Sequence, residues 1–146
     1  MLDFGRYFLP EQHVFLENIN YELVRPEKRT GQLKLNCKDT IVARILDPLR
    51  LKITFNRAIS FEPEGLFYLS VSFSSILRFN PETKDEIDWT KIDLAGEFRK
   101  NGGFLMHNLA SRASLLVAQI SSASGQPPII TAPGVPRFLI SDEEQN

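Results

Sequence analysis

The chain has 146 residues, 42% of them hydrophobic and 24% charged, which is typical of one domain spanning residues 1–146. Its 17 basic and 18 acidic residues leave a net charge of −1, so the excess positive charge with which nucleic-acid binders neutralise phosphates is missing. Cys37 is the only cysteine, which excludes an intrachain disulfide and a cysteine-based zinc site within one chain.

The sequence contains no targeting or membrane signal that we recognise. The first residues include Asp3 and Arg6, and no run of about eighteen uncharged apolar residues occurs anywhere. We therefore expect a cytoplasmic protein that is neither secreted nor membrane-spanning.

Alternating apolar residues predict strands in the first half of the chain, because this period places side chains on one face of a sheet. One run comprises Val14, Leu16 and, after a slip in phase, Ile19, Tyr21 and Leu23; a shorter run comprises Leu33, Leu35 and Cys37. The polar segment 26–31 is expected to connect them. Residues 41–46 keep neither period and fit a covered loop or the extension of a strand.

The clearest alternation runs from Leu49 to Phe61 and, after a turn at 62–65, resumes from Phe67 to Phe79. Only Arg57 breaks the apolar side of the first run. The two runs are expected to pair as a long antiparallel hairpin with one apolar and one solvated face.

An apolar spacing of three to four residues predicts helices in the second half. A short helix is expected over 88–101, ended by Gly102 and Gly103, and an amphipathic helix over 103–124, ended by Gly125. Because prolines withhold amide donors, segment 126–136 is expected to be an ordered extended connector, and 141–146 a flexible polar tail.

The polar face of the longer helix consists mainly of small side chains. Its serines are Ser111, Ser114, Ser121, Ser122 and Ser124, of which the first four are the candidate interface residues. Small residues permit another helix to approach closely, so this face is a candidate oligomer interface; an exposed face of low charge is the alternative.

Groups that could carry out catalysis are sparse. His13 and His107 are the only histidines and belong to no metal or catalytic motif. Cys37 is in phase with Leu33 and Leu35, which favours a packed side chain over a reactive thiolate. The sequence therefore predicts no enzyme activity, no cofactor and no metal site.

Aromatic residues are more numerous than one helix-covered sheet face readily hides: eleven phenylalanines, three tyrosines and one tryptophan. Part of this surplus is expected at a surface groove or subunit contact, because exposed apolar patches usually mark binding sites. The alternative is that the N-terminal rings cap the core.

The order of four strands, a long helix, a Gly-Pro-Pro connector and a terminal apolar segment resembles the bacterial export chaperone SecB and its SecB-like relatives. The most specific stretch, residues 112–133, reads RASLLVAQISSASGQPPIITAP and is similar to the family's long helix, glycine break and connector. The run from Leu49 to Phe79 is similar to the family's third and fourth strands, and Phe15 to Leu23 to its first.

This resemblance implies an α+β fold, with a four-stranded antiparallel sheet and helices packed on one face. It implies a homotetramer built as a dimer of dimers, and ATP-independent binding of unfolded polypeptides in apolar grooves, as in protein export. The translocase motor SecA is a candidate partner. We expect the groove to be lined by Ile19, Tyr21, Leu23, Leu33, Leu35, Phe138 and Leu139.

Two other functions fit the sequence. A SecB-like partner dedicated to one client, such as a toxin–antitoxin pair, suits the near-neutral charge better than general export. A hot-dog-like thioesterase or small-ligand binder also combines a curved antiparallel sheet with a long helix, and would need His107 as its catalytic group.

Overall fold

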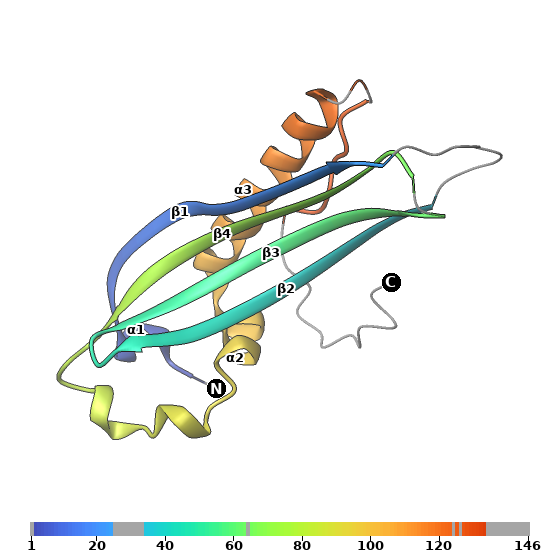
Figure 1. The fold of residues 1–146 in the computed structure, drawn as a ribbon. Helices are drawn as coiled ribbons and strands as arrows, with labels where there is room; N and C mark the ends of the chain where they lie inside the picture. Colours follow the sequence, from blue (N-terminus) through green and yellow to red (C-terminus); the bar gives the residue numbers. More distant parts are fainter. Residues whose placement is uncertain (1, 25–33, 64, 124, 126, 134–146) are drawn as a thin grey trace.

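A computed structural model describes residues 2–24, 34–63, 65–123, 125 and 127–133. Its strands are β1 (Phe8–Leu23), β2 (Lys34–Asp47), β3 (Arg50–Glu62) and β4 (Phe67–Phe79); its helices are α1 (Phe4–Tyr7), α2 (Leu94–Asn101) and α3 (Gly103–Ala123), with 3-10 turns at Lys84–Glu86 and Trp89–Lys91. The strands form one antiparallel sheet in the order β1-β4-β3-β2, and α2 and α3 lie on one side of it (Figure 1). The predicted α+β architecture, with helices on one face, is confirmed.

The predicted central hairpin, β3 with β4, supplies most of the core. Leu51, Ile53, Phe55 and Ile59 are fully buried beneath the helices, while Lys52, Thr54, Asn56 and Ala58 are half-buried on the opposite face. That opposite face is polar: the hydroxyls of Ser70 and Ser72 both donate to Asn56 Oδ1 at 2.7 Å. The predicted contrast between an apolar and a polar face is therefore confirmed.

The slip in phase within the first predicted strand is a β-bulge. Leu16 pairs with Phe73 and Asn18 with Ser72, so Glu17 is the extra residue. The bulge keeps the apolar residues before and after it on the helix side of β1. Glu17 itself points to the polar side, where its carboxylate accepts hydrogen bonds from Lys52, Thr54 and Ser74.

The second strand, β2, continues well beyond the apolar run of Leu33, Leu35 and Cys37 that predicted it. Residues 41–46, which fitted either a loop or a strand extension, are the second half of β2 and pair with β3 as far as Ile45 opposite Leu51. Val42 obscures the alternation because it is apolar but 59% exposed on the polar side of this edge strand.

The prediction of a helix over 88–101 is wrong for residues 88–93. Asp93 caps α2, its carboxylate accepting the Gly96 amide at 3.1 Å, so the helix begins only at Leu94. Residues 88–91 form a separate 3-10 turn that Asp88 caps. The ends of α2 and α3 agree with the predictions, and Gly125 adopts a left-handed backbone with φ of 83° just beyond α3.

The N-terminal aromatic residues cap the core, which was the alternative to a surplus at the surface; of the described aromatic residues, Tyr21 and Phe104 are exposed. Phe8 stacks on Phe79 with ring centroids 5.2 Å apart, and Trp89 packs against both rings and is buried. Most of the large side chains that stay exposed among the described residues are aliphatic: Leu16, Ile19, Leu23, Leu35, Val42, Ile45, Leu49, Leu115 and Ile130, beside Tyr21 and Phe104.

Candidate functional site

A cluster of large apolar side chains occupies the helix side of the sheet where β1 ends and β2 begins. The register places Leu23 beside Phe67 and Leu35 beside Phe61, so one apolar row crosses all four strands. Tyr21 and Ile19 follow in the next rows of β1. We call this surface the apolar platform, and its members are Ile19, Tyr21, Leu23, Leu35, Phe61 and Phe67.

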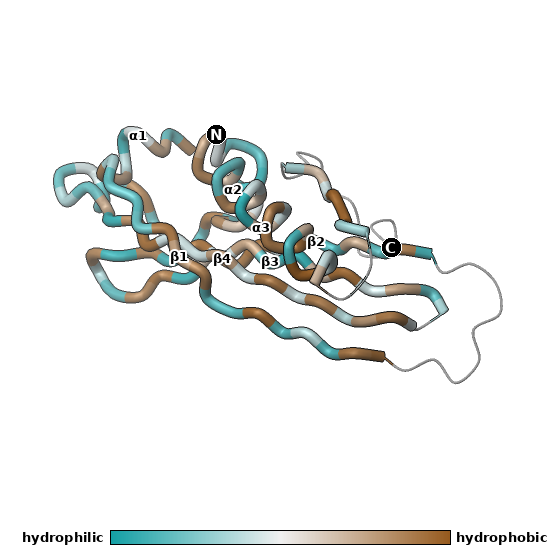
Figure 2. Tube along the Cα trace, turned by 90° about the horizontal axis from the view of Figure 1, so that it is seen from above, coloured by the Kyte–Doolittle hydropathy of each residue, from teal (hydrophilic) through white to brown (hydrophobic). Residues whose placement is uncertain are grey.

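The platform combines fixed rings with solvent-exposed aliphatic groups. The Tyr21 ring stacks on Phe67 at 5.6 Å, and Phe61 meets Phe67 edge-on at 5.3 Å. Leu23, by contrast, is 63% exposed and Leu35 43%. Figure 2 shows that β1 finishes in hydrophobic residues at the end of the sheet farthest from α1. Several exposed apolar side chains at one end of a sheet are typical of a binding site.

Four of the seven residues predicted for the groove lie together on this platform: Ile19, Tyr21, Leu23 and Leu35. They come from both edge strands of the sheet, roughly 14 Å apart across three strand spacings. Leu33, Phe138 and Leu139 lie outside the described residues. The groove prediction missed Phe61 and Phe67, although both continue the alternation of the central hairpin and therefore share the helix side.

A buried ion pair lies next to the platform. Arg57, 1% exposed, occupies the apolar side of β3, and its guanidinium makes two hydrogen bonds to the Asp39 carboxylate, at 2.7 and 2.8 Å. It also donates to Ser114 Oγ on α3 and, at 2.9 Å, to Thr131 Oγ1. The ion pair thereby ties the sheet to α3 and to the connector, residues 127–133.

The electrostatic environment follows from these contacts. Burial lowers the pKa of Arg57, but the Asp39 carboxylate outweighs that effect and holds the pKa above its ordinary value. Burial, reinforced by the charge of Asp39, raises the pKa of the Cys37 thiol. Cys37 is therefore protonated at neutral pH, in line with its predicted role as a packed side chain.

The connector is extended, as expected for residues 127–133, and two of the predicted interface serines hold it. Ser114 Oγ donates to the Ala132 carbonyl at 2.7 Å. Ser121 is buried; its hydroxyl accepts the Ile129 amide at 2.8 Å and donates to the Val117 carbonyl. Both serines thus have partners within their own chain.

The other two predicted interface serines share a different stripe of α3. With 3.6 residues per turn, Ser111 and Ser122 lie on the same side of the helix as Phe104 and Leu115. Phe104 is 77% exposed and Leu115 62%, so this stripe is apolar and open to solvent. A close contact with another helix would cover this stripe of α3. The predicted oligomer interface therefore stays a proposal.

Chemically reactive groups do not gather in the part of the chain that the structure describes. It contains no cluster of three or more His, Cys, Asp or Glu side chains able to hold a metal ion. His107 is exposed on the first turns of α3, and its side chain makes no hydrogen bond to another described residue. No helix of the described residues is long and apolar enough to cross a membrane.

Comparison with solved structures shows that the chain has a SecB-like fold. It is similar to a SecB-like chaperone from Mycobacterium tuberculosis in complex with a ChAD peptide from the HigA1 antitoxin, with 13% identity, a TM-score of 0.62, and coverage of 88% of this chain and 90% of that one. A protein of unknown function from Streptococcus agalactiae matches at 12% identity over 86% of this chain and 98% of that one, with a TM-score of 0.39, too low to carry an argument. No family model and no curated protein matches the chain.

Proposed function

We propose that this protein is an ATP-independent, chaperone-like protein that binds extended apolar segments of other polypeptides on its apolar platform. The observation that carries the proposal is a set of exposed apolar side chains, Ile19, Tyr21, Leu23 and Leu35, that border the packed rings of Phe61 and Phe67. The SecB-like fold, seen in a chaperone in complex with a peptide, supports it.

The binding needs no reactive group. Burying a leucine or phenylalanine side chain contributes about 1.5–3 kcal/mol, so a client that places two or three such side chains on the platform gains roughly 3–9 kcal/mol. Immobilising the client costs about 4 kcal/mol or more, which leaves broad and weak binding at one site. Several sites on one oligomer would strengthen the binding by avidity.

The proposal extends to the assembly. A homotetramer built as a dimer of dimers would place several platforms on one cytoplasmic particle, and the exposed stripe of α3 would form one of its contacts. Leu33, Phe138 and Leu139 remain proposed members of the binding surface.

A dedicated partner of one client is the second candidate function. The similar chaperone was solved with an antitoxin peptide, and the net charge of −1 offers little attraction for a charged partner such as SecA. Binding to a single neighbouring antitoxin, with no protection of unrelated clients, would favour this function over general export.

Charge placed on the platform tests the proposal. Leu23→Asp and Tyr21→Asp should weaken the suppression of aggregation of a chemically denatured client, measured by light scattering, because a buried carboxylate replaces an apolar contact. Losing one leucine contact corresponds to roughly 10- to 100-fold weaker binding. Leu23 is 63% exposed on an edge strand, so its variant should remain folded.

Asn20→Asp is the matched control. Asn20 lies on β1, the same strand as Leu23, but it pairs with Ser70 of β4 on the polar side of the sheet. The Asn20→Asp substitution therefore adds the same charge away from the platform. Suppression by this variant should equal that of the wild type. Equal suppression by Leu23→Asp and the wild type, in a folded oligomer of unchanged mass, would contradict the proposal.

A further inference from the structure

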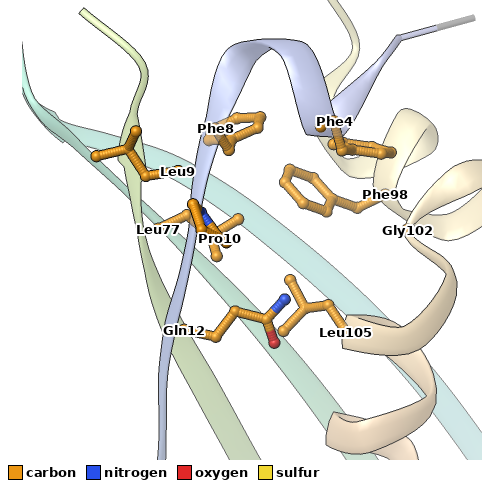
Figure 3. A pocket seen from close by; sticks show the side chains of 10 residues that line it. Phe4, Phe8, Leu9, Pro10, Gln12, Leu77, Phe98, Gly102 and Leu105 are labelled. Carbon is orange, nitrogen blue, oxygen red and sulfur yellow. The ribbon is translucent and has the colours of Figure 1, made fainter.

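The two sides of β1 differ where the strand begins near α1. Figure 3 shows the helix side, where an apolar pocket opens beside Phe98, whose ring centroid lies 4.7 Å from that of Phe4 and 6.0 Å from that of Phe8. The Gln12 side chain points toward α3 on this same side. Because side chains alternate along a strand, the next residue, His13, points to the polar side of the sheet.

A separate cleft of about 440 Å³ lies on that polar side. Its lining comes from β1, β3 and β4 and consists of Glu11, Gln12, His13, Arg50, Ile76 and Arg78. This volume is within the usual range of ligand pockets. The cleft and the apolar platform therefore lie on opposite sides and at opposite ends of the sheet.

Two arginines of this lining are neighbours in the sheet. Arg50 of β3 and Arg78 of β4 are direct partners in the strand register, a position in which like charges destabilise a pair of strands. Arg50 Nε donates to Asp47 Oδ2 at 2.9 Å, whereas Arg78 makes no hydrogen bond or ion pair with another described residue. An anion in the cleft would supply the counter-charge that Arg78 lacks among these residues.

The next row of the sheet adds two more cations. Lys52 pairs with Ile76 on one side and with Arg44 on the other, so a second pair of like charges adjoins the first. Lys52 donates to the Glu17 carboxylate, but exposed Arg44 makes no ion pair with another described residue. The positive charges of the two rows outnumber the negative ones even when Glu11 is included, which favours an anionic ligand.

The lining also selects the chemistry of the anion. One guanidinium already satisfies a carboxylate, whereas a phosphoryl group has oxygens and charge enough for two. Glu11 would repel a second phosphoryl group and would accept hydrogen bonds from hydroxyl groups. Half-buried Ile76 and the His13 ring, which lies 5.7 Å from the Phe15 ring, form an apolar wall for the carbon skeleton of a ligand.

We propose that this cleft binds a phosphate monoester of a small hydroxylated molecule, with the phosphoryl group held by Arg50 and Arg78. The hydroxyl groups of the ligand lie toward Glu11, and its carbon skeleton rests on Ile76. This site goes beyond the proposed chaperone-like function, because it uses no residue of the apolar platform. A polypeptide on one side of the sheet and a phosphate monoester on the other can be bound at the same time.

Calorimetric titration of the full chain with ribose 5-phosphate tests the proposal. Ribose 5-phosphate should bind at least about 10-fold more tightly than ribose, which lacks the phosphoryl group and its charged hydrogen bonds. It should also bind more tightly than inorganic phosphate, which lacks the hydroxylated part. Raising the salt concentration should weaken the binding, because the attraction is partly electrostatic.

Arg78→Gln should weaken the binding of ribose 5-phosphate about 10- to 100-fold, since it removes a charged hydrogen-bond donor. Arg78 is exposed, and losing its charge relieves the repulsion with Arg50. The melting temperature of the ligand-free variant should therefore equal or exceed that of the wild type, which separates lost binding from lost folding.

Arg44→Gln is the matched control. It removes the same charge from the polar side of the sheet, but on β2, which lies two strand spacings or about 10 Å from β4 and outside the lining of the cleft. Exposed charges this far apart are largely screened at physiological salt. Under those conditions the control should bind ribose 5-phosphate as the wild type does.

Each alternative result overturns the proposal. Equal binding of ribose and ribose 5-phosphate, or no binding of either, removes the site. Inorganic phosphate that binds as tightly as ribose 5-phosphate would mean an adventitious ion only. An equal loss of affinity in Arg78→Gln and Arg44→Gln would mean a diffuse attraction without a defined cleft. Tighter binding of a phosphoserine peptide, lost in Arg78→Gln, would make a phosphorylated polypeptide the ligand.

The cleft and the platform are tested separately. Leu23→Asp should leave the binding of ribose 5-phosphate unchanged, and Arg78→Gln should leave the suppression of aggregation unchanged. Loss of ribose 5-phosphate binding in Leu23→Asp would place the ligand on the platform and contradict the proposed cleft site.

Discussion

Replacing Arg57 by methionine should destabilise the protein strongly. The substitution keeps a long unbranched side chain at a position that is 1% exposed, but removes both hydrogen bonds to Asp39 and the contacts to Ser114 and Thr131. The Asp39 side chain, only 13% exposed, is then left as an unpaired carboxylate. The loss of stability comes from burying the unpaired Asp39 carboxylate away from water, and not only from losing its attraction to Arg57.

Breaking a buried ion pair from one side typically costs about 3–5 kcal/mol. For a chain of this length that corresponds to a fall in melting temperature of about 10 °C. Replacing both partners by apolar residues is often close to neutral. The double variant Arg57→Met with Asp39→Leu should therefore recover most of the loss, which gives a large coupling free energy between the two positions.

Urea unfolding followed by circular dichroism, at one protein concentration for all four members of the cycle, measures this coupling. Amide exchange near Thr131 should rise in the single variant, because Arg57 anchors the connector. A single variant that loses less than about 1 kcal/mol, or a double variant no more stable than the single one, would refute the reasoning.

Two further predictions concern the polar side of the sheet and the exposed stripe of α3. Hydrogen bonds from Lys52 and Ser74 hold the pKa of Glu17 below its ordinary value of 4.5, so its stabilisation is present above that pH and is lost as the pH falls through the lower, folded-state pKa. The difference in melting temperature between wild type and Glu17→Gln, clear at pH 7, should therefore shrink below pH 4, and a constant difference would contradict this. Leu115→Arg and Ser122→Arg should lower the solution mass measured by light scattering, and an unchanged mass would remove the proposed interface; Ser114 is unsuitable for this test, since it holds the connector.

The sequence predicted those parts of the fold in which each residue repeats a local pattern. The alternation on both sides of residues 62–65 defined β3 and β4 because both strands are central and covered by helices on one face. The same rule was weaker for β2, an edge strand on which Val42 is both apolar and exposed. The start of α2 was missed because the Asp93 cap overrides an apolar spacing that continues upstream.

The candidate site was predicted only in part, since it depends on which strands become neighbours. Tyr21 and Leu35 were chosen from separate runs, and the register of four strands brings them onto one surface. The interruption at Arg57 was visible in the sequence, but its partners at Asp39, Ser114 and Thr131 lie 18, 57 and 74 residues away. The rings around Phe98 similarly join segments whose proximity no local period encodes.

The extra residue at Glu17 shifts the alternation of side chains along β1 by one position. In a regular strand of the same residues without the bulge, the residues beyond Leu16 would exchange sides, and Asn20 and Glu22 would replace Tyr21 and Leu23 toward α3. A relative with one residue fewer at this point would pair regularly and keep its later apolar residues on the helix side, whereas a chain that has the extra residue needs the bulge to do so. The bulge is therefore the backbone feature that holds the β1 part of the apolar platform on the helix side of the sheet.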